Sequence, residues 1–223
     1  MALTTTKCVD FVTLRSRGLS AAIIVKLMMA CNDLSLTDQA LADWKNEQRR
    51  DRISKQSGAC MYFVRAQISH LYEGLIVIQK LRQDSELSKL VRTCDPHTQR
   101  CFHELKQYVC AGPRRDWFEK LAGRIRSNLA FHYDESGKLV MKAIADRASE
   151  PKANVSLVTQ GDTIHQWHFK VADDVVDSIV VRQIWDIPRD ADLRVQADAI
   201  AEEIHKIVLL FLDFSGEVIW KYL

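Results

Sequence analysis

The chain has 223 residues, 47% of them apolar and 27% charged, which is enough apolar sequence to close a hydrophobic core and excludes a disordered protein. The 31 lysines and arginines nearly balance 29 aspartates and glutamates, so a formal charge of +2 excludes a protein drawn to nucleic acid by its overall charge alone. With 8 glycines and 4 prolines the chain has few turn residues, and its composition favours helices over an all-β fold.

The first predicted helix covers residues 18–32, where apolar residues recur every four positions. Its apolar stretch at 21–31 contains Lys26 and is about half of the ~20 residues that a membrane span needs. We therefore expect no membrane contact and no secretory segment, and the six cysteines are expected as free thiols of a cytoplasmic protein. Capping residues at 35–38 predict a second helix, which runs into a solvated charged segment at 45–52.

The middle of the chain predicts three further helices. The longest covers residues 59–83 and is apolar on more than one face, which is typical of the central helix of a bundle. Pro96 and Pro113 interrupt the pattern and predict shorter helices over 97–109 and from 113 to about 133. The last of these has a core stripe made of Phe118, Leu121, Ile125 and Leu129.

The final third of the sequence is predicted to be helical except for one segment. After a turn at 134–137 a helix is expected to resume over 139–147, and between 154 and 170 the apolar period becomes two, which predicts a β-hairpin. Asp173 and Asp174 are expected to cap a helix that ends at Trp185, and a last helix is predicted over 190–214. No repeat or linker divides the chain, so we predict one all-α domain over residues 1–223, a helical bundle with one hairpin insertion.

The densest group of polar and aromatic residues lies near the end of the helix that starts at Pro113. Residues 124–134 read Arg-Ile-Arg-Ser-Asn-Leu-Ala-Phe-His-Tyr-Asp. Asn128 and His132 are four residues apart and share a helical face, where the amide can hold the imidazole in one orientation. On a straight helix Arg126 lies roughly 120° around and about 9 Å along from His132, so a second surface or a symmetry mate is needed to bring both to one site.

This segment resembles the Arg-x(4–6)-His signature of HEPN-domain proteins, the helical-bundle ribonucleases and RNA-binding modules of defence systems. The resemblance is strongest over residues 117–134, where Phe131, Tyr133 and Asp134 also look like the residues around the histidine in bacterial members. It implies a HEPN-like bundle that forms a homodimer, with Arg126 and His132 of both copies in a shared cleft.

The activity that the resemblance implies is toxin-type or defence-type cleavage of RNA without metal or cofactor. His132 then serves as general acid or base, and Arg126 binds the phosphorane oxygens as charge develops. RNA, and an antitoxin or a nucleotidyltransferase-like protein, are the partners that the family suggests.

Other readings of the same residues stay open. Active members commonly have Asn, Asp or His directly after the arginine, whereas this chain has Ser127, so the main alternative is an inactive HEPN-like dimerisation or interaction module. His132 could also simply end a helix near the negative end of its dipole, with Arg126 as a solvated cation. A basic edge on the same helix either helps to hold RNA or is an ordinary wet helix face; it consists of Arg114, Arg115, Lys120 and Arg124.

Two further groups carry weaker expectations. His70 and Glu73 share a face of the central helix and predict either a paired core contact or support of Arg126 or His132 by Glu73. A Cys/His run has the ligand types of a zinc-dependent enzyme, but its spacing matches no strong zinc motif, so we expect no bound metal and cysteines that behave as small apolar residues. The run consists of Cys94, His97, Cys101 and His103.

Overall fold

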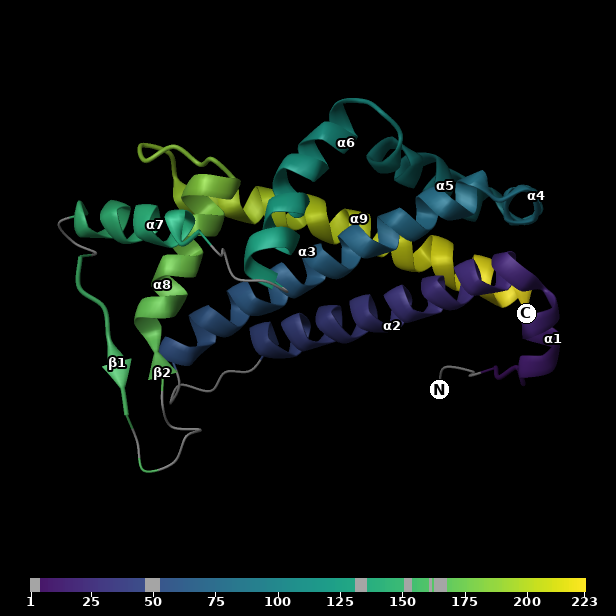
Figure 1. Cartoon of the computed structure of the whole chain (residues 1–223), viewed down its shortest axis with the longest axis horizontal. Coiled ribbons are helices and arrows are strands. Elements are labelled where there is room, and N and C mark those ends of the chain that lie inside the picture. The colour runs from purple at the N-terminus through teal and green to yellow at the C-terminus, as the bar shows by residue number, and fades with distance from the viewer. Residues whose placement is uncertain (1–4, 47–52, 131–135, 151–153, 161, 163–167) are drawn as a thin grey trace.

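Three long helices lie side by side in the computed structural model, which describes residues 5–46, 53–130, 136–150, 154–160, 162 and 168–223 (Figure 1). They are α2 (Gly18–Asn46), α3 (Ile53–Gln83) and α9 (Leu193–Tyr222). One end of this layer carries α1 (Phe11–Ser16), α4 (Ser85–Arg92) and the start of α5 (Pro96–Val109). The other end carries α7 (Lys138–Ala148), α8 (Lys170–Ser178) and a small sheet. The predicted all-α helical bundle is confirmed.

α3 is the central helix, as its apolar circumference predicts. It packs against α2 along one side and against α5, α8 and α9 on others. Ile68, Leu71, Ile78 and Leu81 have no solvent exposure and belong to one contiguous core that also includes residues of α9. Burying apolar surface from so many helices against α3 is the main contribution to the stability of the bundle.

α2 differs from the sequence expectation because it is one uninterrupted helix. The prediction that a second helix starts at residues 35–38 is wrong. The Thr37 hydroxyl donates to the backbone carbonyls of Asp33 and Leu34, at 3.0 Å each, so its hydrogen bonds are made within α2. A threonine that bonds back to the preceding turn does not cap a helix. Burial of Leu34 and Leu41 on either side of it holds this part of α2 against the core.

α2 is also long and apolar enough, by length and composition alone, to cross a membrane over residues 18–44. This is weak evidence, because the core helix of a water-soluble protein passes the same test. Ile24, Leu27 and Leu34 are fully buried, and α2 packs against both α3 and α9. The absence of a membrane span therefore remains a prediction.

Aspartate caps set the starts of α4 and α5. The Asp84 carboxylate accepts hydrogen bonds from the backbone N–H groups of Glu86 and Leu87, and Asp95 plays the same part for α5. Pro96 occupies the first turn of α5, where its missing N–H costs nothing. The expected break at Pro96 is thus confirmed, whereas α4 was not predicted as a separate helix.

The predicted hairpin is present but shorter than the 154–170 segment. β1 (Val158–Thr159) and β2 (His168–Phe169) pair antiparallel, with Val158 opposite Phe169. The second strand ends where α8 begins at Lys170, so the prediction that Asp173 and Asp174 cap a helix is wrong, since both lie inside α8. A π-helical segment, η5 (Ile179–Ile184), continues α8, and α9 extends beyond the predicted end at 214.

Candidate functional site around Arg126

The segment that carries Arg126 is a helix with two π-helical turns. It begins as α6 (Pro113–Phe118) and continues through η2 (Glu119–Gly123) to η3 (Arg126–Ala130). The predicted start at Pro113 is confirmed, and the predicted core stripe is buried: Phe118, Leu121, Ile125 and Leu129 are at most 6% exposed. The sequence did not predict the π turns, which are rare and are frequently found at functional sites.

Arg126 is held on the surface by two residues of α3. Its Nε atom lies 2.8 Å from Oε1 of Glu73, and its guanidinium carbon lies 5.8 Å from the centre of the Tyr72 ring. The side chains of Arg126 and Glu73 are each 45% exposed. The Tyr72 hydroxyl is held in turn, because it donates to Glu119 at 3.1 Å. Arg126 is therefore oriented by a carboxylate and a ring while much of its guanidinium remains open to solvent.

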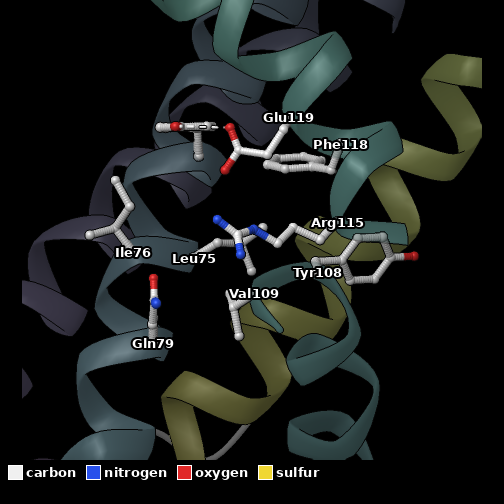
Figure 2. Close-up of a pocket in the computed structure, with 9 residues that line it drawn as sticks. Leu75, Ile76, Gln79, Tyr108, Val109, Arg115, Phe118 and Glu119 are labelled. Carbon is white, nitrogen blue, oxygen red and sulfur yellow. Dashed lines mark hydrogen bonds between the residues drawn. The ribbon is translucent and has the colours of Figure 1, made fainter. Parts of the chain in front are cut away.

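A small pocket lies between α3, α5 and α6, and Tyr72 is part of its lining. Figure 2 shows the Arg115 side chain reaching from α6 across this pocket toward Leu75, Ile76 and Gln79 of α3. The pocket has a volume of about 30 Å³, which suits a water-sized group and excludes a nucleotide base. Arg115 is therefore placed between α3 and α6, near the ring that supports Arg126.

A wider groove lies where α5 ends and α6 begins, next to Arg115 in the chain. It has a volume of about 460 Å³, and its lining includes Arg82, Lys106 and Arg114. We call the line from this groove through Arg115 to Arg126 the basic seam. The seam is not purely positive, because Glu104 lies 2.8 Å from Arg114 and Glu73 lies beside Arg126.

Lys120 and Arg124, the other two cations of the predicted basic edge, contact residues of η5 and of the segment that follows it. Lys120 lies 3.7 Å from Asp186, and Arg124 donates to the backbone carbonyl of Gln183 at 2.9 Å. These contacts join the Arg126 helix to the end of η5. Lys120 and Arg124 thus connect two helical segments, while Arg114 and Arg115 line the basic seam.

His132, Tyr133 and Asp134 lie outside the described residues, as does Phe131. Asn128 lies in η3. Of the pair expected on α3, Glu73 contacts Arg126, and Nδ1 of His70 lies 3.4 Å from Asp33 of α2. The structure therefore places Glu73 at Arg126, which is one of the two contacts expected for it.

Asp177 is a residue of this region that sequence reasoning missed. It is partly buried on α8, which packs against α3; its Oδ1 atom is shielded from solvent and no described residue hydrogen-bonds to it. Burial, and then the negative charges of Asp173 and Asp174, raise the pKa of Asp177 to about 6, while Arg65 acts in the opposite direction. Arg65 donates to the carbonyl of Leu129 at 2.7 Å, at the end of η3.

A carboxyl group with such a pKa is a candidate proton carrier near neutral pH. The recurrence of aspartate at positions 173, 174 and 177 on one predicted helix was the sequence signal for it. The interpretation of Asp173 and Asp174 as caps gives Asp177 no role.

The Cys/His run behaves as expected at its cysteines. Cys94 and Cys101 are buried at 5% and 2% exposure, as expected for small apolar residues, but Sγ of Cys101 also lies 3.6 Å from Nε2 of His97. His103 is exposed and lines a groove together with His97.

Comparison of the chain with protein-family models, with curated proteins and with solved structures gives no match. Any functional conclusion therefore depends on the residues and their geometry.

Proposed function

We propose that this chain is a HEPN-like helical protein that binds RNA and cleaves it without a metal, with Arg126 and His132 as the catalytic pair. The observation that carries the proposal is the state of Arg126: it is half-exposed, fixed by Glu73 and Tyr72, and lies in a π turn at one end of the basic seam. A guanidinium in this state can bind a phosphate with little loss of side-chain entropy.

The reaction we propose is attack of an RNA 2′-hydroxyl on its own phosphate. His132 takes the proton of the hydroxyl or donates one to the leaving 5′-oxygen, and Arg126 stabilises the added negative charge of the phosphorane. The products are a 2′,3′-cyclic phosphate and a 5′-hydroxyl. Arg114 and Arg115 of the basic seam bind the neighbouring backbone phosphates.

The test is to incubate purified protein with an end-labelled structured RNA in EDTA and to identify the 3′ ends. We expect cleavage to a 2′,3′-cyclic phosphate by the wild type, and its loss in Arg126→Ala and in His132→Ala. The matched control is Arg92→Ala, which removes an exposed cation at the end of α4 and leaves the seam intact. Cleavage that survives in Arg126→Ala, or that is equally lost in Arg92→Ala, contradicts the proposal.

A second candidate function is a catalytically silent interaction module, and one observation favours it. The hairpin region exposes a group of apolar side chains next to α8, where a water-soluble surface would ordinarily have polar ones. The group consists of Val155, Leu157, Val158 and Phe169, each at least 50% exposed. Two results together support this candidate. The folded wild type cleaves none of several RNAs, and it binds a partner protein that Val155→Asp no longer binds.

A further inference from the structure

Three potential metal ligands from two helices meet at the start of α5. His97 and Cys101 are one helical turn apart on α5, with Nε2 of His97 3.6 Å from Sγ of Cys101. Asp213 of α9 reaches the same place, with Oδ2 3.4 Å from that Nε2 atom. The three ligand atoms all lie within 4.8 Å of one another.

We propose that His97, Cys101 and Asp213 bind a Zn²⁺ ion that links α5 to α9. Zinc bonds of about 2.0–2.3 Å at tetrahedral angles place neighbouring ligand atoms about 3.4–3.6 Å apart. The two distances that involve His97 already have these values, at 3.6 and 3.4 Å. The remaining pair, Cys101 and Asp213, has to close from at most 4.8 Å to the same range when the ion binds.

The helical spacing explains why one turn of α5 supplies two ligands. Side chains four residues apart lie on the same face, which is why paired histidines at this spacing bind zinc on other helices. The third ligand cannot be predicted from sequence spacing, because Asp213 comes close to His97 and Cys101 only through the packing of α5 against α9.

The site has a buried base and an open rim. Cys101 is 2% exposed, whereas the side chains of His97 and Asp213 are 60% and 58% exposed. A groove with a volume of about 550 Å³, lined by His97, Cys101 and His103, leads to it. An ion can therefore enter from solvent, and the fourth coordination position faces the groove, where a water molecule completes the tetrahedron.

The ligand set selects the metal. Thiolate and imidazole favour Zn²⁺, whereas Mg²⁺ and Ca²⁺ require oxygen ligands. As the zinc–sulfur bond forms, the Cys101 thiol releases its proton to solvent, so the complex carries a thiolate, a carboxylate and a neutral imidazole around one divalent cation. Arg100 lines the same groove and is the nearby positive charge that opposes binding.

The test is titration of the full chain with Co²⁺, which substitutes for Zn²⁺ and reports a thiolate ligand by its charge-transfer absorption. We expect one equivalent to bind and to be displaced by Zn²⁺ but not by Mg²⁺. Cys101→Ser should lose the absorption, and Asp213→Asn should bind the ion at least about tenfold more weakly, since even indirect ligand partners contribute that much. Zn²⁺ should raise the melting temperature of the wild type more than that of Asp213→Asn.

Two control variants change residues that are not proposed ligands. His103→Gln changes an exposed residue of the groove, and Cys110→Ser removes a thiol at the opposite end of α5. Both should bind Co²⁺ as the wild type does. If Cys101→Ser does not fold, the exposed positions His97→Gln and Asp213→Asn decide the question. A wild type without the absorption, or equal affinity in Asp213→Asn, overturns the proposal.

Discussion

At the scale of single residues, Glu73 has two opposite effects on Arg126. Its carboxylate lies 2.8 Å from the guanidinium and fixes it, but the same negative charge competes with a phosphate for that guanidinium. Because the pair is 45% exposed at both side chains, water already screens it, and the contact adds little to stability. The contact therefore matters for phosphate binding by Arg126. Mutation of Arg126 and mutation of Glu73 test the orienting effect and the competing effect separately.

Arg126→Ala is expected to lower RNA affinity and to reduce the slope of log K against log salt by about one, since one phosphate contact is lost. Glu73→Gln is expected to tighten RNA binding, because a competing charge is removed, while cleavage falls as Arg126 loses its orientation. Fluorescence anisotropy at several salt concentrations measures both slopes. Arg92→Ala serves again as the control, and an unchanged slope in Arg126→Ala refutes a phosphate contact at Arg126.

Asp177 predicts a pH dependence of stability at the same scale. Its pKa is raised from 3.8 to about 6 in the folded chain, so the folded state binds this proton more tightly than the unfolded state does. Below about pH 4 both states are protonated and the burial of Asp177 costs nothing. As the pH rises from about 4 through 6 the fold loses stability, on the order of 3 kcal/mol in all, and little more is lost up to pH 8.

Asp177→Asn should therefore be more stable than the wild type at pH 8 and nearly equal to it at pH 4. Urea unfolding at both pH values measures the difference in the free energy of unfolding. Asp190→Asn, at an exposed position between η5 and α9, controls for loss of a negative charge. A difference between Asp177→Asn and the wild type that stays constant from pH 4 to pH 8 is inconsistent with a raised pKa.

At the scale of elements, the contact between α3 and α9 depends on a glycine. A Cβ atom at Gly74 would lie 2.8 Å from Cε2 of Phe211, whose side chain is fully buried. Gly74→Ala should therefore lower the free energy of unfolding by about 1–3 kcal/mol through overpacking, although alanine is the better helix former. Gly216→Ala, on α9 with nothing within 4 Å of its Cβ, should instead raise it by about 0.5–1 kcal/mol.

Chemical denaturation of the two alanine variants beside the wild type decides this prediction. Both changes increase helix propensity equally, so opposite changes in the free energy of unfolding can only come from the different packing around the two glycines. Stabilisation by Gly74→Ala would mean that Phe211 moves aside without cost, and that α3 and α9 pack less tightly than their 2.8 Å approach indicates.

The elements also show what sequence can predict here. Periodicity located the core stripe of Phe118, Leu121, Ile125 and Leu129 because burial follows spacing along a helix. The uninterrupted α2 was not predicted, since the Thr37 hydroxyl can cap a helix or bond back within one, and only packing decides between them. The approach of Asp213 to His97 could not be predicted, because it depends on contacts between helices far apart in sequence.

At the scale of the whole molecule, two surfaces compete as the place where a second copy binds. The HEPN-like proposal requires the Arg126 face, because a symmetry-related copy would bring Arg126 and His132 into one cleft. The exposed apolar residues of the hairpin region favour the other surface, since burial of such a patch is the usual source of association energy. The two surfaces lie on different elements and can be blocked separately.

Light scattering coupled to gel filtration should give twice the 25.6 kDa chain mass for the wild type. Ser127→Arg places a bulky cation at an exposed position beside Arg126, and like charges at a symmetric interface repel, so it should yield a monomer that does not cleave RNA. Val155→Asp alters a residue that is 80% exposed on the hairpin side and should leave both dimer and cleavage unchanged. The reverse result, a monomer only in Val155→Asp, assigns dimerisation to the hairpin surface and removes the shared cleft that the ribonuclease proposal needs.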